Sequence, residues 1–338
     1  MKKILITGSN GFIGTNIYDT FHDDIELFGL DISKRSKFPK NQLFNWEELD
    51  KIPPVDMIIH LAGKAHDTKN QSEASSYFEV NTGLTKNIYD WFLLSKAKKF
   101  IFFSSVKAAT DTVIGEILTE DVIPTPKGPY GESKRAAEMY ILDELEKLNA
   151  SEGARGEKGE SVMEREKKDG IEKGHFDKKV YILRPCMIHG SGNKGNMNLL
   201  YKIVKKAIPW PLGAFDNQRS FCSIDNLNFV IRNLIEKDIE SGIYQIADDQ
   251  PLSTNELIRL IAESLDKKTR IWNINKTFIR SLARLGNIFH LPLNNERLKK
   301  LTESYVVSNQ KIKKAMGIEK MPVSAEEGFK KTFKSFQK

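Results

Sequence analysis

Four side chains in the first half of the sequence have the types and spacing needed for proton transfer. Tyr130 and Lys134 lie four residues apart in a helical pattern, which places them on one helix face, one turn apart. A tyrosine with an unperturbed pKa of about 10 is a poor base, but a nearby ammonium favours the phenolate and lowers that pKa. Ser104 and Ser105 end the apolar run 100–103, where a hydroxyl would reach a substrate. Together these groups predict acid–base chemistry at an oxygen atom.

A second set of residues, near the N-terminus, has the pattern of a phosphate-binding turn. Gly8, Gly11 and Gly14 follow a short apolar run and precede a helical pattern, which predicts the strand, turn and helix of a dinucleotide-binding unit. Gly8 permits a sharp turn, Gly11 lets backbone N–H groups approach a pyrophosphate, and Gly14 lets the helix lie close to the strand. The helix start at Phe12 and Ile13 then directs unpaired N–H groups and the positive dipole end at the phosphates.

An acidic residue follows at the distance that this motif requires. Asp31 ends the apolar run 25–30, and a carboxylate there accepts hydrogen bonds from both ribose hydroxyls of NAD and repels a 2′-phosphate. Lys34 and Arg35 come soon after and are suited to a 2′-phosphate. NAD(H) is therefore the favoured cofactor, and NADP(H) stays open as the alternative.

Strand and helix patterns alternate along the first half of the chain, which predicts an α/β fold with a doubly wound parallel sheet of the Rossmann type. The run 55–63 is predominantly apolar, as a strand buried on both faces requires. At its end, Leu61, Ala62 and Gly63 let the backbone lie beside the cofactor, while the side chain of His60 is predicted to be structural. Ligands in such sheets lie beyond the carboxyl ends of the strands.

Composition limits the class of protein. The chain has 338 residues, of which 40% are hydrophobic, and it shows neither an N-terminal signal nor a long apolar run, so we expect a cytoplasmic protein without an integral membrane segment. Cys186 and Cys222 have no paired spacing, so neither a disulfide framework nor a metal site is expected. The net charge of +7 comes from lysines on helical patterns without interleaved aromatics, which disfavours nucleic acid and favours anionic substrates such as nucleotides.

These motifs resemble those of the extended short-chain dehydrogenase/reductases, the NAD-dependent epimerase/dehydratase family acting on nucleotide sugars. The resemblance rests on TGSNGFIG (7–14), HLAG (60–63), the serine pair and YGESK (130–134), and continues through LRPCMIHG (183–190), KGNMN (194–198), PLGA (211–214) and QRSFCSIDNL (218–227). It is closest to bacterial reductases of UDP-4-keto-6-deoxy-N-acetylhexosamines in surface-polysaccharide pathways. The resemblance implies a Rossmann domain over 1–189 and a smaller, mainly substrate-binding subdomain over 190–338, with the option that the latter returns elements to the sheet.

The resemblance also implies roles for residues in the second half of the chain. Pro185 would lie beside the nicotinamide, the amide of Asn196 would contact the nucleotide diphosphate, and Arg219 would pair with phosphate, for which a planar guanidinium is well shaped. Arg297 is a weaker phosphate candidate. Relatives form homodimers through the helices at 72–95 and 130–148, so a homodimer is expected here.

Two segments depart from a simple version of this family. Residues 151–179 are dominated by charged residues and glycine, and this composition predicts a mobile surface insertion where relatives have a shorter loop. Residues 278–293 have an amphipathic pattern with arginines, which fits a membrane-surface helix but is more typical of an internal packing helix.

The residues after the serine pair separate the reactions of the family. Dehydratases place an Asp-Glu pair there, and Val106 and Lys107 stand in those positions, so dehydration is disfavoured. Epimerases usually show a Tyr-Gly pair shortly after the serine, where this chain has Lys-Ala-Ala-Thr (107–110). We therefore expect hydride transfer between NAD(P)(H) and C4 of a UDP-linked 4-keto hexose. The alternatives are a UDP-hexose 4-epimerase and, less favoured, a non-catalytic dinucleotide-sensing regulator.

Overall fold

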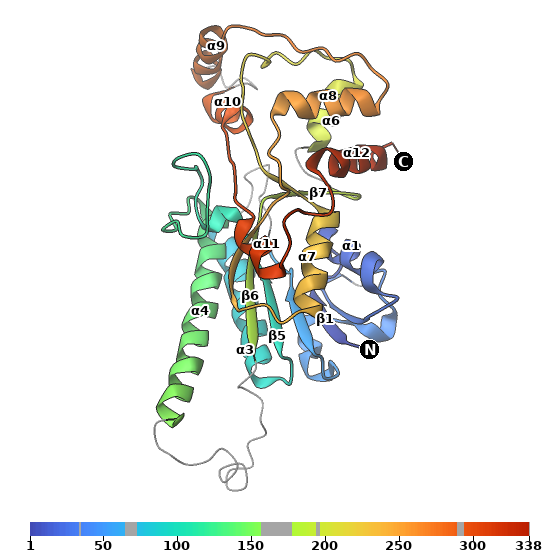
Figure 1. The fold of residues 1–338 in the computed structure, drawn as a ribbon, viewed down its shortest axis with the longest axis vertical. Coiled ribbons are helices and arrows are strands. Elements are labelled where there is room, and N and C mark those ends of the chain that lie inside the picture. Colours follow the sequence, from blue (N-terminus) through green and yellow to red (C-terminus); the bar gives the residue numbers. More distant parts are fainter. Residues whose placement is uncertain (34, 65–72, 157–177, 194–196, 289–293, 338) are drawn as a thin grey trace. The chain divides into compact units, whose positions relative to one another are not determined.

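The computed structural model describes the whole chain apart from residues 34, 65–72, 157–177, 194–196, 289–293 and 338 (Figure 1). The chain forms two compact units. The first unit consists of Met1–Asp111, Ile123–Arg184 and Glu240–Tyr244, and the second of Thr112–Val122, Pro185–Ile239 and Gln245–Lys338.

The first unit is built on a parallel sheet with helices on both faces, which confirms the predicted Rossmann-type α/β fold. Among the described residues the sheet has seven strands in the order β3-β2-β1-β4-β5-β6-β9, and each neighbouring pair from β3 to β6 is parallel. Its strands are β1 (Lys3–Thr7), β2 (Glu26–Leu30), β3 (Leu43–Phe44), β4 (Met57–His60), β5 (Lys99–Phe103), β6 (Lys179–Pro185) and β9 (Gly242–Ile246). The order reverses at β1, between β2 and β4, and this switch point is where such sheets bind ligands.

The connecting segments of the first unit are mostly helical. They comprise α1 (Phe12–Phe21), the short 3-10 helices η1 (Lys40–Gln42), η2 (Trp46–Lys51) and η4 (Val106–Ala108), α2 (Ala74–Tyr77), the π-helical turn η3 (Phe78–Gly83), α3 (Leu84–Leu94) and α4 (Pro129–Gly156). On one face of the sheet, Ile88 and Phe92 of α3 and Ala137 and Ile141 of α4 pack in one apolar cluster with strand residues such as Phe100. This packing fixes α4, which carries the predicted catalytic pair, against the sheet.

Two helices differ from their predicted form. The predicted helix over 72–95 contains the π-helical turn η3, and Asn81 in that turn is fully buried. Such turns widen a helix locally and are frequent at functional sites. The helix predicted over 130–148 continues to Gly156 and so reaches into the segment predicted to be a mobile insertion. The rest of that segment, 157–177, lies outside the described residues.

The second unit has its own hydrophobic core beneath several short helices. Its described elements are β7 (Met187–His189) paired with β8 (Phe221–Ser223), and the helices α6 (Met197–Lys205), α7 (Ile224–Glu236), α8 (Thr254–Ser264), α9 (Lys276–Ile288), α10 (Asn295–Thr302), α11 (Gln310–Met316) and α12 (Ala325–Ser335). Trp210, Ile261, Phe329 and Phe333 are among the buried residues that hold α6, α8 and α12 together. The predicted capping box at Ser253 and Glu256 opens α8.

A helix that crosses a bilayer must be both long and apolar, and none of the described helices combines these two properties.

Gly8 offers a test of the switch-point geometry. Its φ is +66°, and a Cβ there would lie 2.8 Å from the backbone nitrogen of Ala62. Gly115 also has a positive φ, +87°, but a Cβ there would meet nothing within 4 Å. We expect Gly115→Ala to lower the free energy of unfolding by about 1–2 kcal/mol through backbone strain alone. Gly8→Ala should lower it by at least ~1 kcal/mol more because of the steric overlap. Urea unfolding measures both, and equal losses would contradict the close approach.

Candidate active site

The glycine-rich turn has the geometry that a pyrophosphate site requires. Gly8 lies at the end of β1, and the backbone N–H of Gly11 donates to its carbonyl oxygen at 3.0 Å. Gly14 is buried at the start of α1, where a Cβ would lie 2.6 Å from the carbonyl oxygen of Ser9. Gly11 is the N-cap of α1 without a side-chain cap, so the first N–H groups of the helix, at Phe12 and Ile13, point from its positive end.

Asp31 is held beside this turn by backbone groups. Its Oδ2 accepts from the N–H of Asn10 at 3.0 Å, and its Oδ1 accepts from the N–H of Ser33 at 2.9 Å. The side-chain oxygen of Asn10 is buried and has no hydrogen-bond partner among the described residues. A carboxylate and an unsatisfied amide oxygen together fit the hydroxyl groups of a ribose. This arrangement suits NAD(H). Of the two cations that would suit the 2′-phosphate of NADP(H), Lys34 lies outside the described residues, and the contacts of Arg35 do not favour either cofactor.

The strand-end segment 60–63 provides the opposite wall of the switch point. Thr85 donates its hydroxyl to the carbonyl of Asn81 at 2.6 Å, so His60 Nε2 donates to Thr85 Oγ1 at 2.9 Å. His60 Nδ1 then accepts from the hydroxyl of Thr7 at 2.6 Å. Burial, followed by the charge of Lys134, lowers the pKa of His60 well below its ordinary value. The His60 side chain is thus neutral and links Thr7 to Thr85, which is the structural role predicted for it. Leu61, Ala62 and Gly63 would approach a cofactor through their backbone.

The predicted acid and its partner hydroxyl lie together at the end of β5. The phenol of Tyr130, in the first turn of α4, is hydrogen-bonded to the side chain of Ser105. Ser105 is buried and is the N-cap of η4, where its Oγ accepts from the N–H of Lys107 at 3.2 Å. Burial raises the pKa of Tyr130 above its ordinary value, and the Ser105 hydrogen bond opposes this only in part. The phenol is therefore protonated at neutral pH, which is the form of a proton donor.

Lys134 lies one turn further along the same helix. Its Nζ donates to the carbonyl of Phe103 at 2.8 Å and lies 5.0 Å from the ring centre of Phe102. Burial lowers the pKa of Lys134 to about 8, and the charge of Glu138 opposes this. The raised pKa of Tyr130 reflects its burial and the nearby Tyr77 rather than a charge effect of Lys134. A Cβ at Gly63 would lie 3.0 Å from Nζ, so the glycine leaves the room that the ammonium occupies.

Sequence reasoning missed Asn81, which joins three parts of this site. Its Nδ2 donates to the hydroxyl of Ser133 on α4 at 3.0 Å, and its Oδ1 accepts from the N–H of Lys64 at 2.7 Å. The same oxygen would lie 2.9 Å from a Cβ at Gly63. Asn81 therefore positions the start of α4 relative to the end of β4. The sequence did contain one sign of this role: Asn81 is a polar residue at a helix position where the apolar pattern predicts burial.

Sequence reasoning also missed Glu138, which is fully buried one turn after Lys134. Its carboxylate accepts from Arg184 Nε at 2.8 Å and from Arg184 NH2 at 2.6 Å. Ser104 donates its hydroxyl to the same carboxylate at 2.6 Å. Ser104 is thus engaged with Glu138, whereas Ser105 contacts Tyr130. The two serines, which are adjacent in the sequence and were predicted together, have different partners.

The predicted substrate-binding residues belong to the second unit. The guanidinium of Arg219 donates to the carbonyl of Lys300 at 2.5 Å, so Arg219 contacts α10, whose first turn contains the exposed Arg297. Burial lowers the pKa of Arg219 from its ordinary value. Pro185 is buried at the end of β6, and Asn196 lies outside the described residues. The contacts of these residues with a nucleotide or nicotinamide stay predictions.

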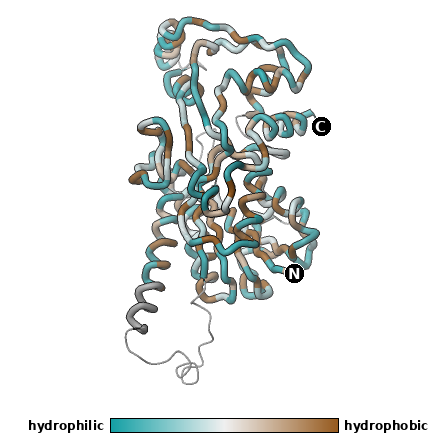
Figure 2. The backbone as a smooth tube through the Cα atoms, in the orientation of Figure 1, coloured by the Kyte–Doolittle hydropathy of each residue, from teal (hydrophilic) through white to brown (hydrophobic). Residues whose placement is uncertain are grey.

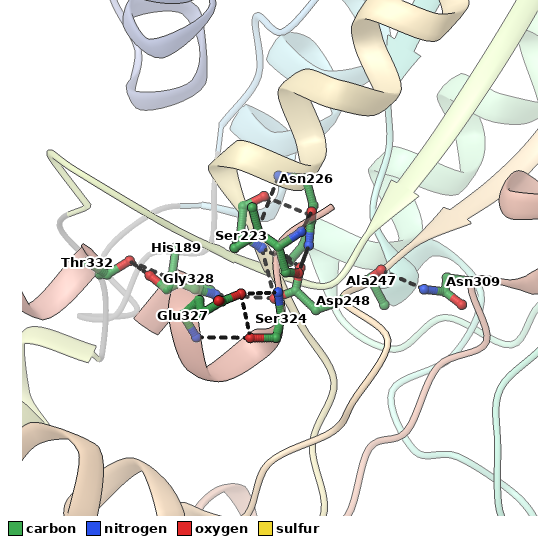
Figure 3. Close-up of polar contacts among 12 residues, drawn as sticks. His189, Ser223, Asn226, Ala247, Asp248, Asn309, Ser324, Glu327, Gly328 and Thr332 are labelled. Carbon is green, nitrogen blue, oxygen red and sulfur yellow. Dashed lines mark hydrogen bonds and ion pairs between the residues drawn. The ribbon is translucent and has the colours of Figure 1, made fainter. Parts of the chain in front are cut away.

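The second unit also contains a serine, a histidine and an aspartate in contact, but their geometry is structural (Figure 3). Asp248 accepts from the backbone N–H and the hydroxyl of Ser223 at 3.0 and 3.2 Å, and from Asn226 at 2.7 Å. Ser223 is the N-cap of α7. His189 contacts Thr332 at 2.9 Å, and all these groups are buried. In a nucleophilic triad the histidine lies between the serine and the aspartate. Here the serine contacts the carboxylate directly, so these residues do not form such a triad.

Comparison with known proteins agrees with this geometry. Residues 4–150 match the model of the NAD dependent epimerase/dehydratase family. This part of the chain is similar to that family. Since the family is NAD dependent and enzymatic, the match supports the predicted NAD-dependent enzyme of the extended short-chain dehydrogenase/reductase type.

Individual relatives extend over most of the chain. A UDP-glucose 4-epimerase of Vibrio cholerae is 29% identical across 99% of this chain and 95% of its own length. An N-acetyl-alpha-D-glucosaminyl-diphospho-ditrans,octacis-undecaprenol 4-epimerase of Escherichia coli O157:H7 is 24% identical across 92% of this chain and 85% of its own. The crystal structure of the Bordetella bronchiseptica enzyme WbmG with NAD and UDP superimposes with a TM-score of 0.70 at 14% identity, covering 99% of this chain and 93% of that one. The last likeness concerns the fold.

Glu138→Gln tests the buried pair. The change leaves the Arg184 guanidinium buried without an anion, so we expect the free energy of unfolding to fall by about 3–5 kcal/mol. Glu144→Gln, which removes a surface pair with Lys147 on the same helix, is the control and should lose at most ~1 kcal/mol. Thermal and urea unfolding measure both variants, and a loss at Glu138 no larger than at Glu144 would show that the pair is dispensable.

Lys134→Met tests the buried ammonium. The folded-state pKa of about 8 lies below the ordinary value of 10.5. The unfolded chain therefore binds more protons between these values, and the stability contributed by this group rises with pH through that window. At pH 7 the variant should be more stable than the parent by about 1–3 kcal/mol. The difference should shrink towards pH 10, and a difference independent of pH from 7 to 10 in urea unfolding would contradict the lowered pKa.

Proposed function

We propose that this protein transfers hydride between NAD(H) and C4 of a UDP-linked sugar. The hydrogen bond between Ser105 and the protonated phenol of Tyr130 is the observation that carries the proposal, because it places a proton donor and a second hydroxyl at one point beyond β5. In this proposal Tyr130 exchanges a proton with the sugar oxygen, Ser105 orients that oxygen, and Lys134 holds the nicotinamide ribose. The bound cofactor supplies or accepts the hydride.

Reduction of a 4-keto sugar is the direction that the state of Tyr130 favours. A carbonyl that receives hydride also needs a proton, and a phenol whose pKa is raised by burial holds one at neutral pH. Lys107, which stands where dehydratases carry an acidic residue, is paired with Asp111 at 2.8 Å. We therefore propose a UDP-4-keto-6-deoxy-N-acetylhexose 4-reductase of surface-polysaccharide synthesis, with NADP(H) as the less favoured cofactor.

The nucleotide end of the substrate is assigned to the second unit. We propose that Asn196 and Arg219 bind the diphosphate, with Arg297 as a further cation, and that Pro185 borders the nicotinamide. The assignment is supported by the guanidinium of Arg219 in contact with α10. In the same proposal the protein is a homodimer joined through α3 and α4, and residues 190–338 supply most of the substrate-binding subdomain.

A UDP-sugar 4-epimerase is the second candidate. It is favoured by the relative from Vibrio cholerae, whose name is UDP-glucose 4-epimerase and which matches 99% of this chain. An epimerase uses the same proton and hydride positions but returns the hydride to the other face of the sugar. Tyr130 would then act first as a base and afterwards as an acid.

The two candidates differ in net redox change. A reductase consumes one NADH for each UDP-4-keto sugar, and the fall in absorbance of the reduced cofactor measures the turnover. An epimerase interconverts UDP-glucose and UDP-galactose, or their N-acetyl forms, without net consumption, which chromatography of the sugar nucleotides detects. Stoichiometric NADH loss with a UDP-4-keto sugar supports the reductase, and interconversion without it supports the epimerase.

Tyr130→Phe tests the role that both candidates share. Removing the hydroxyl removes the proton donor, and we expect turnover to fall by roughly 10²–10⁴-fold. Tyr140→Phe is the matched control: it lies on the same helix, where its hydroxyl donates to Asp90 on the surface, and it should keep the parental rate. Normal turnover of Tyr130→Phe would exclude the proposed chemistry.

A further inference from the structure

Helix α9 has two apolar stripes, of which only one is covered. Ile279 and Ala283 are buried in the core of the second unit, in the same cluster as Leu298 of α10. Phe278, Leu282 and Leu285 are exposed, and Phe278 retains 57% of its accessible surface. Spacings of four and three residues place these three side chains on one stripe beside the buried one. The helix is therefore anchored by one stripe and presents the other to its surroundings.

The exposed apolar residues are concentrated around this helix. Trp272, just before α9, is 56% exposed, so the 14 residues from 272 to 285 hold four of the 15 large exposed hydrophobic side chains in the described part of the chain. In Figure 2, the helix labelled α9 in Figure 1 carries hydrophobic and hydrophilic residues side by side. Scattered exposed apolar residues are ordinary, but a local group with tryptophan and phenylalanine indicates an interaction surface.

The charge around the stripe is of one sign. Residues 267–295 contain six lysines and arginines and no aspartate or glutamate, whereas the whole chain has 52 basic and 45 acidic residues. The six cations are all exposed: Lys267, Lys268, Arg270, Lys276, Arg280 and Arg284. Arg280 and Arg284 are exposed and each follows a buried residue of α9, so they lie on the flank of the buried stripe that faces away from Phe278, Leu282 and Leu285. Basic residues flanking an apolar stripe with tryptophan at its edge are typical of helices that lie in the headgroup region of a membrane.

A second copy of the chain fits this surface poorly. A two-fold contact between identical surfaces would set one group of six cations against another, with no acidic residue in the segment to balance them. An anionic phospholipid surface offers both the negative charge and the apolar layer that the segment lacks. We propose that Trp272 and the exposed stripe of α9 dock on the surface of a bilayer containing anionic phospholipid, with Arg280 and Arg284 at the headgroup phosphates.

Vesicle sedimentation with the full-length protein tests this docking. We expect the protein to sediment with vesicles of phosphatidylcholine and phosphatidylglycerol and to stay in the supernatant with phosphatidylcholine alone. Raising NaCl from about 0.1 M to about 1 M should release it, because the screening length shortens. Arg280→Gln/Arg284→Gln should weaken partitioning roughly tenfold, and Phe278→Gln/Leu282→Gln at least ~tenfold.

Control variants distinguish the loss of this surface from a general loss of charge, hydrophobicity or folding. Ile123→Gln changes another exposed apolar residue, and Lys314→Gln/Lys320→Gln removes two exposed cations elsewhere; both should partition like the parent. Circular dichroism melting of each variant checks folding, and the salt dependence of the parent provides a measurement without any variant. The proposal is overturned by absence of sedimentation, by equal binding to neutral vesicles, or by parental binding of both α9 variants. If the parent is a dimer that does not bind vesicles, and only the α9 variants are monomers, the exposed stripe is instead a contact with a second copy of the chain. None of these readouts depends on enzymatic activity.

Discussion

The buried carboxylate of Glu138 is the group on which the geometry of the first unit depends. It receives two hydrogen bonds from Arg184 on β6 and one from Ser104 after β5, and it lies one helical turn after Lys134. A buried pair of this kind contributes little net stability compared with apolar residues, but it holds only when all its partners are in place. Helix α4 is thereby fixed in rotation and height against two strands. This fixed position is what allows Tyr130, two turns earlier, to contact Ser105.

The second constraint is the absence of side chains at the switch point of the sheet. A Cβ at Gly8 would overlap the backbone of Ala62, and a Cβ at Gly63 would overlap the side chains of Asn81 and Lys134. The strand ends of β1 and β4 and the face of α4 therefore come closer than ordinary residues allow. Close approach leaves backbone N–H groups and one ammonium where a dinucleotide needs them. The motif glycines and Lys134 are parts of one packing arrangement.

Local patterns in the sequence predicted the parallel sheet, the glycine turn and the pairing of Tyr130 with a serine at the end of β5. Each depends on spacing within one element or on the common edge of a parallel sheet. Asn81 and Glu138 were missed because their roles depend on contacts with residues about 50 positions away, which no local pattern contains. In the structure burial is the largest cause of the raised pKa of Tyr130, and burial depends on the fold rather than on a local pattern of residues. The match to the family model ends at residue 150, so the roles inferred for residues in the second half depend more on their contacts in the structure.

A reductase and an epimerase need the same donor at Tyr130 and the same hydroxyl at Ser105, so these residues do not distinguish them. They differ in whether the keto sugar rotates in the site before the hydride returns to C4. Such rotation depends on how tightly the parts of the sugar other than C4 are held. Buried Val106 and Ala108 of η4 border the serine, and the salt bridge of Lys107 with Asp111 stiffens the same segment. If Ser105 orients the sugar oxygen as proposed, a short, fixed segment beside that oxygen would restrict rotation of the sugar ring. Such a restriction would favour a single hydride delivery over inversion.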